Sequence, residues 1–298
     1  LFAANVEGVG VMGAQGFRLE RRTPLVNAMA AGRVPVAVGD HGLILERRDA
    51  GWVDPTPTAS RGDVVAFIER EALQAVTADC ELLERGTSGW TSRTLLPTER
   101  CADAVADGPS LVVLTAGGSV VEFDASLGQT GRESLGSGLE GRRLWRAESG
   151  ALVVTTATDV FVKPPGGLFD AVRALGGTGA WGVSGRGSIA RVCGLAQGGL
   201  ADLDLSRNPP VVTPVPLLRA DDCRAVLPLA AGGWAIASRE QEFPHVLVVA
   251  ADGTSRNITL NLQATFIEDL LETPRGIAVA SDGYAFINAA SPAVRVEP

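Results

Sequence analysis

Val11-Met-Gly-Ala-Gln-Gly-Phe-Arg-Leu-Glu-Arg-Arg22 and Ala37-Val-Gly-Asp-His-Gly-Leu-Ile-Leu-Glu-Arg-Arg48 are two copies of one pattern, identical at six of twelve positions. A third copy, Ala75-Val-Thr-Ala-Asp-Cys-Glu-Leu-Leu-Glu-Arg85, begins 38 residues after the second, and Gly51-Trp52 recurs in step as Gly89-Trp90. A unit of about 38 residues cannot bury its apolar face alone, so neighbouring units must stack on one another. The repeat therefore indicates an array of similar units.

A hairpin of two short apolar strands recurs along the rest of the chain. It is found at 112–123, 152–162, 192–203, 234–249 and 276–287. The strands are rich in Val, Ala and Leu, and most of the turns hold Gly, Asp or Ser, which is typical of short β-strands. The units predicted from this spacing are 1–25, 26–61, 62–99, 100–139, 140–177, 178–219, 220–263 and 264–298.

Four-stranded units of about 40 residues are typical of a β-propeller, which has four to eight blades. We therefore expect an all-β fold in which residues 1–298 form a single β-propeller domain of eight four-stranded blades. The alternative is seven blades with the N-terminal strands completing the last blade, because the first two hairpins are only 26 residues apart.

Three motifs carry a resemblance to known repeats. Units two and three contain Phe67 with Ala75-Val76, Ala37-Val-Gly-Asp-His-Gly42 and Asp49-Ala-Gly-Trp52. These resemble the repeat of the photosystem II stability and assembly factor family of propellers, which is close to the Asp-box (BNR) repeat. The last unit, with Pro274-Arg-Gly-Ile-Ala-Val-Ala-Ser-Asp-Gly283, is similar to an NHL-type blade. The resemblance implies a type of propeller repeat rather than an activity.

Composition limits the classes of partner. The chain has 298 residues, of which 46% are hydrophobic and 20% charged, so it can fill a core. Its net charge of −8 argues against a nucleic-acid-binding surface, which needs clustered Lys and Arg. No apolar run reaches the ~18 residues that a membrane-spanning helix needs. Leu1-Phe-Ala-Ala-Asn5 lacks a start methionine and a basic region, and we expect that any signal peptide has been removed.

The four cysteines are the most informative candidate site residues. Cys80 lies in a turn and Cys101 opens the next unit, and in a propeller these places share one face of neighbouring blades. Cys193 lies in a second strand, and Cys223 again opens the following unit. These positions within the repeat units predict the disulfides Cys80–Cys101 and Cys193–Cys223, each of which would stabilise the fold by roughly 3 kcal/mol. Four buried free thiols are the alternative. Disulfides would imply an oxidising compartment, extracellular, periplasmic or at the cell surface.

Other polar residues do not form a reactive set in the sequence. His41 and His245 are expected in turns of separate units, and with no Cys-x-x-Cys motif we expect no metal site. A sialidase, which the Asp-box likeness raises, needs a tyrosine nucleophile and an arginine cluster. Tyr284 is the only tyrosine, and charged strand ends such as Glu46-Arg47-Arg48 are typical of a solvated rim. We predict no catalytic, cofactor-binding or metal-binding residue, and no cofactor.

We expect a non-enzymatic, exported propeller that serves as a binding or assembly scaffold for another protein or a surface polymer. The expected contact surface is a longer turn with Arg239, Glu240, Gln241, Glu242 and Phe243. Two alternatives remain open. One is a hydrolase or lyase that acts on glycans or lactones through the central channel, and the other is a structural module of a larger surface assembly.

Overall fold

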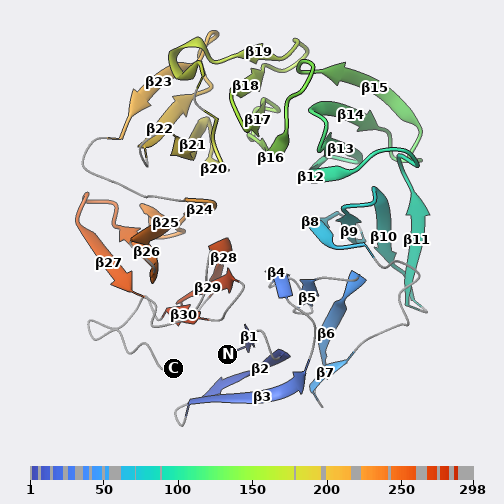
Figure 1. The fold of residues 1–298 in the computed structure, drawn as a ribbon, viewed down its shortest axis with the longest axis vertical. Helices are drawn as coiled ribbons and strands as arrows, with labels where there is room; N and C mark the ends of the chain where they lie inside the picture. The colour runs from blue at the N-terminus through green and yellow to red at the C-terminus, as the bar shows by residue number, and fades with distance from the viewer. Residues whose placement is uncertain are drawn as a thin grey trace. The chain divides into compact units, whose positions relative to one another are not determined.

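The structure is a computed structural model, drawn in Figure 1. The chain falls into two compact units: residues 1–64 with 88–90 and 222–298, and residues 65–87 with 91–221. The structure describes residues 2–5, 8–13, 16–22, 26–30, 36–39, 42–48, 51–53, 62–70, 72–87, 89–177, 179–195, 199–215, 223–240, 243–259, 267–273, 276–281 and 285–287.

The second unit is built from four-stranded antiparallel sheets whose strands follow one another in chain order. The first contains β8 (Val64–Glu69), β9 (Leu73–Thr77), β10 (Glu81–Arg85) and β11 (Trp90–Thr94). The next contains β12 (Cys101–Asp107), β13 (Ser110–Thr115), β14 (Ser119–Phe123) and β15 (Gln129–Ser134). Then follow β16 (Gly141–Arg146), β17 (Leu152–Thr156), β18 (Val160–Lys163) and β19 (Asp170–Ala171). The last contains β20 (Gly182–Arg186), β21 (Ile189–Leu195), β22 (Gly199–Asp204) and β23 (Val211–Pro214).

The central hairpin β13–β14 shows why these residues form strands. Leu111 to Leu114 are all buried, as expected for a strand covered on both faces. The tight turn ends at Gly118, whose N–H donates to the Thr115 carbonyl at 3.0 Å. Gly118 has φ +74°, and an added Cβ would lie 3.0 Å from the Leu139 side chain. The turn therefore needs glycine both for its backbone and for its space.

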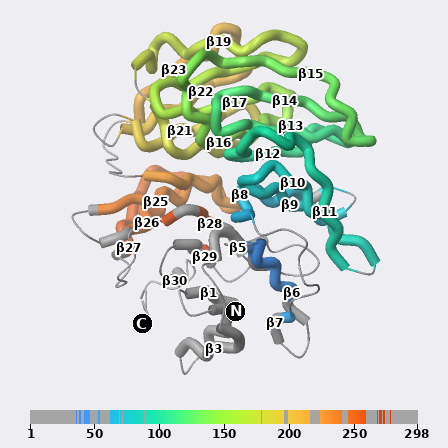
Figure 2. The backbone as a smooth tube through the Cα atoms, turned by 45° about the vertical axis from the view of Figure 1, so that its right-hand side comes forward, coloured from blue at the N-terminus to red at the C-terminus, as the bar shows by residue number. Residues whose placement is uncertain are grey.

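The apolar cores of the second unit lie between successive sheets rather than in one central mass. One cluster joins Val76 and Leu82 to Val113 and Phe123, and further clusters join β12–β15 to β16–β19 and β16–β19 to β20–β23. Within this unit β16 lies beside β12 (Figures 1 and 2), and β20 lies beside β16 (Figure 1). Each sheet therefore buries its faces against its neighbours.

Polar side chains also link successive sheets. Asp103 accepts hydrogen bonds from its neighbour's N–H, on Ala104, and from the Leu144 N–H of the next sheet, both at 2.8 Å. Lys163, the only lysine of the chain, has its Nζ 2.7 Å from Glu122 Oε1 and 3.5 Å from Glu133 Oε2 in the preceding sheet. Burial alone would lower the pKa of Lys163, but these two carboxylates outweigh it and raise the pKa above its usual value.

The first unit contains the sheets at both ends of the chain. They are formed by β1 (Phe2–Asn5), β2 (Gly8–Gly13) and β3 (Gly16–Arg22), by β4 (Val26–Ala30), β5 (Val36–Gly39), β6 (Ile44–Arg48) and β7 (Gly51–Val53), by β24 (Val226–Pro228), β25 (Trp234–Glu240), β26 (Phe243–Val249) and β27 (Ser255–Thr259), and by β28 (Ile267–Thr273), β29 (Gly276–Ser281) and β30 (Ala285–Ile287). In this unit β4 lies beside β28 and β29, whereas β1 lies beside β29 and β30.

The expected all-β fold of four-stranded sheets is confirmed, with two differences in detail. The described residues form three strands rather than four in the first and last sheets. Glu46 is fully buried within β6 rather than part of a solvated rim. Because Glu46 pairs with Val36 across the hairpin, its place is set by strand register, which the charged sequence around it does not reveal.

Candidate functional site

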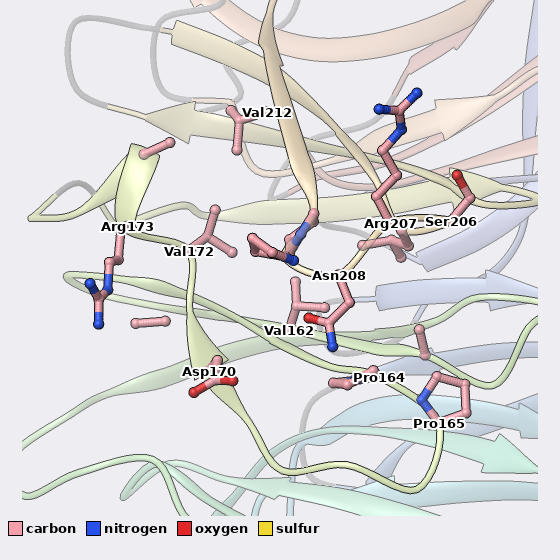
Figure 3. A pocket seen from close by; sticks show the side chains of 16 residues that line it. Val162, Pro164, Pro165, Asp170, Val172, Arg173, Ser206, Arg207, Asn208 and Val212 are labelled. Atoms are coloured by element: carbon pink, nitrogen blue, oxygen red, sulfur yellow. The ribbon is translucent and has the colours of Figure 1, made fainter.

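The candidate site is a groove of about 850 Å³ in the second unit, between the sheet β16–β19 and the sheet β20–β23 (Figure 3). One wall comes from β18, β19 and the 3-10 turn Arg173–Leu175, and the other from the connection between β22 and β23. The lining residues are Ala151, Val162, Pro164, Pro165, Asp170, Ala171, Val172, Arg173, Ala174, Leu205, Ser206, Arg207, Asn208, Pro209, Pro210 and Val212.

The first wall is shaped by the turn that follows β18. Pro164 has no N–H to continue a ladder, so the chain leaves the strand there, and the Gly167 N–H closes a turn onto the Pro164 carbonyl at 3.0 Å. The chain then returns along β18, where the Val172 N–H donates to the Val160 carbonyl at 2.8 Å. The Phe169 N–H donates to Glu133 Oε1 at 2.6 Å, which fixes the start of the returning segment.

The second wall is held by an aspartate-centred turn. Asp204 Oδ1 accepts hydrogen bonds from the Ser206 N–H at 3.0 Å and from Ser206 Oγ at 2.6 Å. These bonds from Ser206 lower the pKa of Asp204 below its usual value. The Leu205 N–H donates to the Ser188 carbonyl at 2.8 Å. The turn thus fixes the backbone that carries Arg207 and Asn208 into the second wall.

Most of the lining residues are apolar, and five are polar or charged. Val162 and Val172 are buried, and four proline rings complete the apolar surface. In Figure 3 the Asn208 amide points toward Val162 and Pro164, whereas the Arg207 guanidinium points away from them. Arg173 and Arg207 are exposed, and Asp170 is the one acidic residue of the lining. With Asp204 3.8 Å from Arg207, the groove and its edge carry two positive and two negative charges.

A few large apolar side chains of the described residues are exposed to solvent: Leu168 at 72%, Val211 at 43% and Trp181 at 37%. Trp181 is stacked against Arg142, whose guanidinium carbon lies 3.3 Å from the ring centroid. Leu168 lies in the connection between β18 and β19, two residues before the lining residue Asp170. Because side chains alternate along a strand, Val211 lies on the opposite face of β23 from the lining residue Val212.

The cysteines are all in disulfides in the structure. Cys80 and Cys101 are bonded with a Cα–Cα distance of 5.0 Å, and both are buried. The Cys101 N–H donates to the Ala78 carbonyl at 3.0 Å, which brings the turn and the next sheet together. Cys193 and Cys223 are also disulfide-bonded, and both are fully buried. The described part of the chain contains no free cysteine.

The expected contact loop and the histidines are placed differently from the sequence interpretation. Arg239, Glu240 and Phe243 belong to the paired strands β25 and β26, with Glu240 opposite Phe243, so these three residues are not part of a turn. Gln241 and Glu242 lie outside the described residues. His245 lies within β26, opposite Ser238 and Thr259, and is only 6% exposed, so its expected place in a turn was wrong. His41 and Tyr284 lie outside the described residues.

The sequence contains one signal for the groove that the sequence analysis does not use, namely two pairs of consecutive prolines. Pro164-Pro165 and Pro209-Pro210 each follow the third strand of consecutive sheets, and all four prolines line the groove.

Among the described residues no group of three His, Cys, Asp or Glu side chains is arranged to hold a metal ion. Within the same residues no helix is long and apolar enough to cross a membrane.

No family model and no curated protein matches the sequence. Solved structures do match the fold. YCF48 bound to D1 peptide is similar with a TM-score of 0.65 at 14% identity, over 84% of this chain and 88% of that one. Virginiamycin B lyase from Staphylococcus aureus has a TM-score of 0.62 at 12% identity, over 95% and 92%. The WD40 β-propeller domain of Doa1 has a TM-score of 0.68 at 11% identity, over 87% and 90%. These likenesses show that the chain has a β-propeller fold.

Proposed function

We propose that this protein is a non-enzymatic, exported β-propeller that serves as a binding or assembly scaffold for another protein. The observation that carries the proposal is the groove between β16–β19 and β20–β23, which is lined by four prolines and three valines and by the exposed Arg173, Arg207 and Asn208. Apolar groups that line a preformed concave surface lose unfavourable hydration when a partner covers them. Disulfides support export to an oxidising compartment.

Two finer features belong to the same proposal. The relation to the photosystem II assembly factor family is supported by the repeat motifs of units two and three and by the likeness to YCF48. We infer seven blades rather than eight, since β4 lies beside β28 and β29 as β16 lies beside β12 and β13. This arrangement leaves β1–β3 beside the last sheet, at β30, instead of between it and β4–β7.

A site-directed crosslinking experiment tests the binding function. A photoreactive amino acid is placed at Leu168, beside the groove, or at Thr98, an exposed polar position in the same unit. With extracellular extract of the native organism, we expect one protein to crosslink at position 168 and not at position 98. Excess unmodified protein should compete with it. Absence of any partner at position 168, together with measured turnover of a glycan or lactone, would overturn the proposal.

A further inference from the structure

The groove between β16–β19 and β20–β23 has the chemistry of a peptide site. We infer that it binds an extended segment of a partner protein, with one large apolar side chain on the floor and an acidic side chain beside Arg173 or Arg207. The inference rests on the proposed function and names the ligand class of the same site. It depends on the shape of the groove, the polar group inside it and the charge at its rim.

The shape fits one apolar anchor and the backbone around it. A volume of about 850 Å³ lies within the range of roughly 300–1,000 Å³ found for small-ligand pockets. The valines at positions 162, 172 and 212 supply the apolar contact surface. The proline rings beside them have a fixed backbone φ, so the walls lose little conformational entropy when a ligand binds.

The polar group inside the groove matches a peptide backbone. The Asn208 side chain carries both an acceptor oxygen and donor N–H groups, which are complementary to a peptide N–H and C=O. It is exposed, and it points toward the apolar floor between the two walls (Figure 3). An asparagine in this position can hold the main chain of a ligand irrespective of its sequence.

The neighbouring strand edge does not offer an alternative mode of peptide binding. β23 is the last strand of its sheet and could accept an added strand. Pro214 within it and Pro210 immediately before it have no N–H to donate, and prolines at an edge strand oppose such pairing. The ligand therefore lies in the groove rather than extending the sheet.

The exposed arginines favour an acidic side chain next to the apolar anchor residue of the ligand. Arg173 and Arg207 are exposed at the groove, and Arg207 has only a long contact of 3.8 Å with Asp204. An exposed pair of this kind holds the guanidinium weakly, so the group can turn to a ligand carboxylate. The opposing carboxylates are Asp170 in the lining and Asp204 beside Arg207, and among the described residues no ion pair holds Arg173, so its guanidinium is the one best placed for a ligand carboxylate.

The test uses random linear peptides displayed on phage and panned against the folded chain of residues 1–298. We expect enriched peptides to combine Leu, Ile or Phe with Asp or Glu a few positions away. Synthetic copies are then measured by fluorescence anisotropy. The Arg173→Glu/Arg207→Glu variant should weaken the acidic peptides about tenfold or more and, when panned itself, select basic residues instead. Arg100→Glu, an exposed arginine elsewhere in the same unit, should leave their Kd unchanged.

A further variant separates binding from folding. Asn208→Ala changes an exposed side chain, so the melting temperature should be kept while peptide affinity falls about tenfold. Enriched peptides that lack acidic residues, or that bind this variant as tightly as the parent, overturn the inference. The inference is also overturned when a protein crosslinks at position 168 but panning enriches no peptide. In that last case the proposed binding function stands. That function is overturned when position 168 crosslinks no partner and the protein turns over a glycan or lactone.

Discussion

At the scale of single residues, the aspartate-centred turn is the recurrent device of this fold. Asp124 Oδ1 accepts bonds from the Ser126 N–H and Oγ and from the Gly128 N–H, at 2.9, 2.7 and 2.9 Å. Asp252 accepts from the Thr254 N–H and Oγ1 at 2.9 and 2.6 Å, and Asp204 is bonded in the same way to Ser206. All three connect the third and fourth strands of their sheets. A short Asp-x-Ser/Thr segment thus fixes loops that differ in their further sequence.

These turns predict a specific loss of stability in acid. Hydrogen bonds from the serine or threonine side chain lower the pKa of Asp124, Asp204 and Asp252 below 3.8 in the folded state. A lowered folded pKa gives stability that is complete above the unfolded pKa and is lost as pH falls through the folded value. We expect the melting temperature to fall below about pH 4.

Thermal unfolding between pH 5 and pH 2 checks this prediction. The variant Asp124→Asn/Asp204→Asn/Asp252→Asn removes the three ionisations, so its melting temperature should vary less with pH than that of the parent. Equal slopes for the two proteins would show that other carboxylates cause the acid response.

At the scale of elements, Asp103 shows how one strand fixes the next sheet. Its carboxylate accepts the Leu144 N–H of β16 as well as the Ala104 N–H beside it. Asp103→Asn leaves one of these N–H groups without a matched acceptor, and we expect a loss of about 2 kcal/mol in the free energy of unfolding. Urea denaturation measures this loss.

A matched control lies on the same strand. Asp107 forms an ion pair of 2.5 Å with Arg146 near the surface, with 43% of its side chain exposed. Because exposed ion pairs contribute little, Asp107→Asn should cost less than about 1 kcal/mol. Equal effects of the two substitutions would contradict the role of Asp103 between sheets.

The hairpins were predictable from the sequence because their apolar runs are locally encoded. The hairpin expected at 112–123 is formed by β13 and β14, where apolar runs flank a glycine turn. The extension of β25 and β26 through Arg239, Glu240 and Phe243 was not predictable, since pairing across the hairpin overrides their polar, turn-like sequence. The groove could not be predicted either, because its walls come from two separate connections that only packing of the sheets brings together.

At the scale of the whole molecule, disulfides restrain the unfolded chain. Cys80 and Cys101 are 21 residues apart, and closing a loop of this length stabilises the fold by roughly 3 kcal/mol. We therefore expect Cys80→Ala/Cys101→Ala to lower the free energy of unfolding by about this amount. Intact mass spectrometry should show a gain of two hydrogens for each bridge after reduction. A mass that does not change on reduction would contradict both bridges.

Removal of the N-terminal strands tests the blade number. In a seven-bladed ring β4 packs directly against β28 and β29, so a chain lacking residues 1–25 should remain monomeric and unfold in one cooperative transition. In an eight-bladed ring the same deletion opens a gap between the last sheet and β4–β7. Aggregation or a lost thermal transition would show that the N-terminal strands are needed to close the ring, either as a blade of their own or as part of the last one. Size-exclusion chromatography and circular dichroism distinguish the two outcomes.

The setting of Lys163 has a practical consequence for measuring ligands. Its amine is held by Glu122 and Glu133, its pKa is raised, and its side chain is only 18% exposed. Acylating reagents need a neutral, accessible amine, and the α-amino group has the lower pKa of about 8. With a single lysine in the chain, coupling at neutral pH will favour the terminal amine. Molecules tethered to a biosensor chip in this way share one orientation and leave both arginines of the groove unmodified.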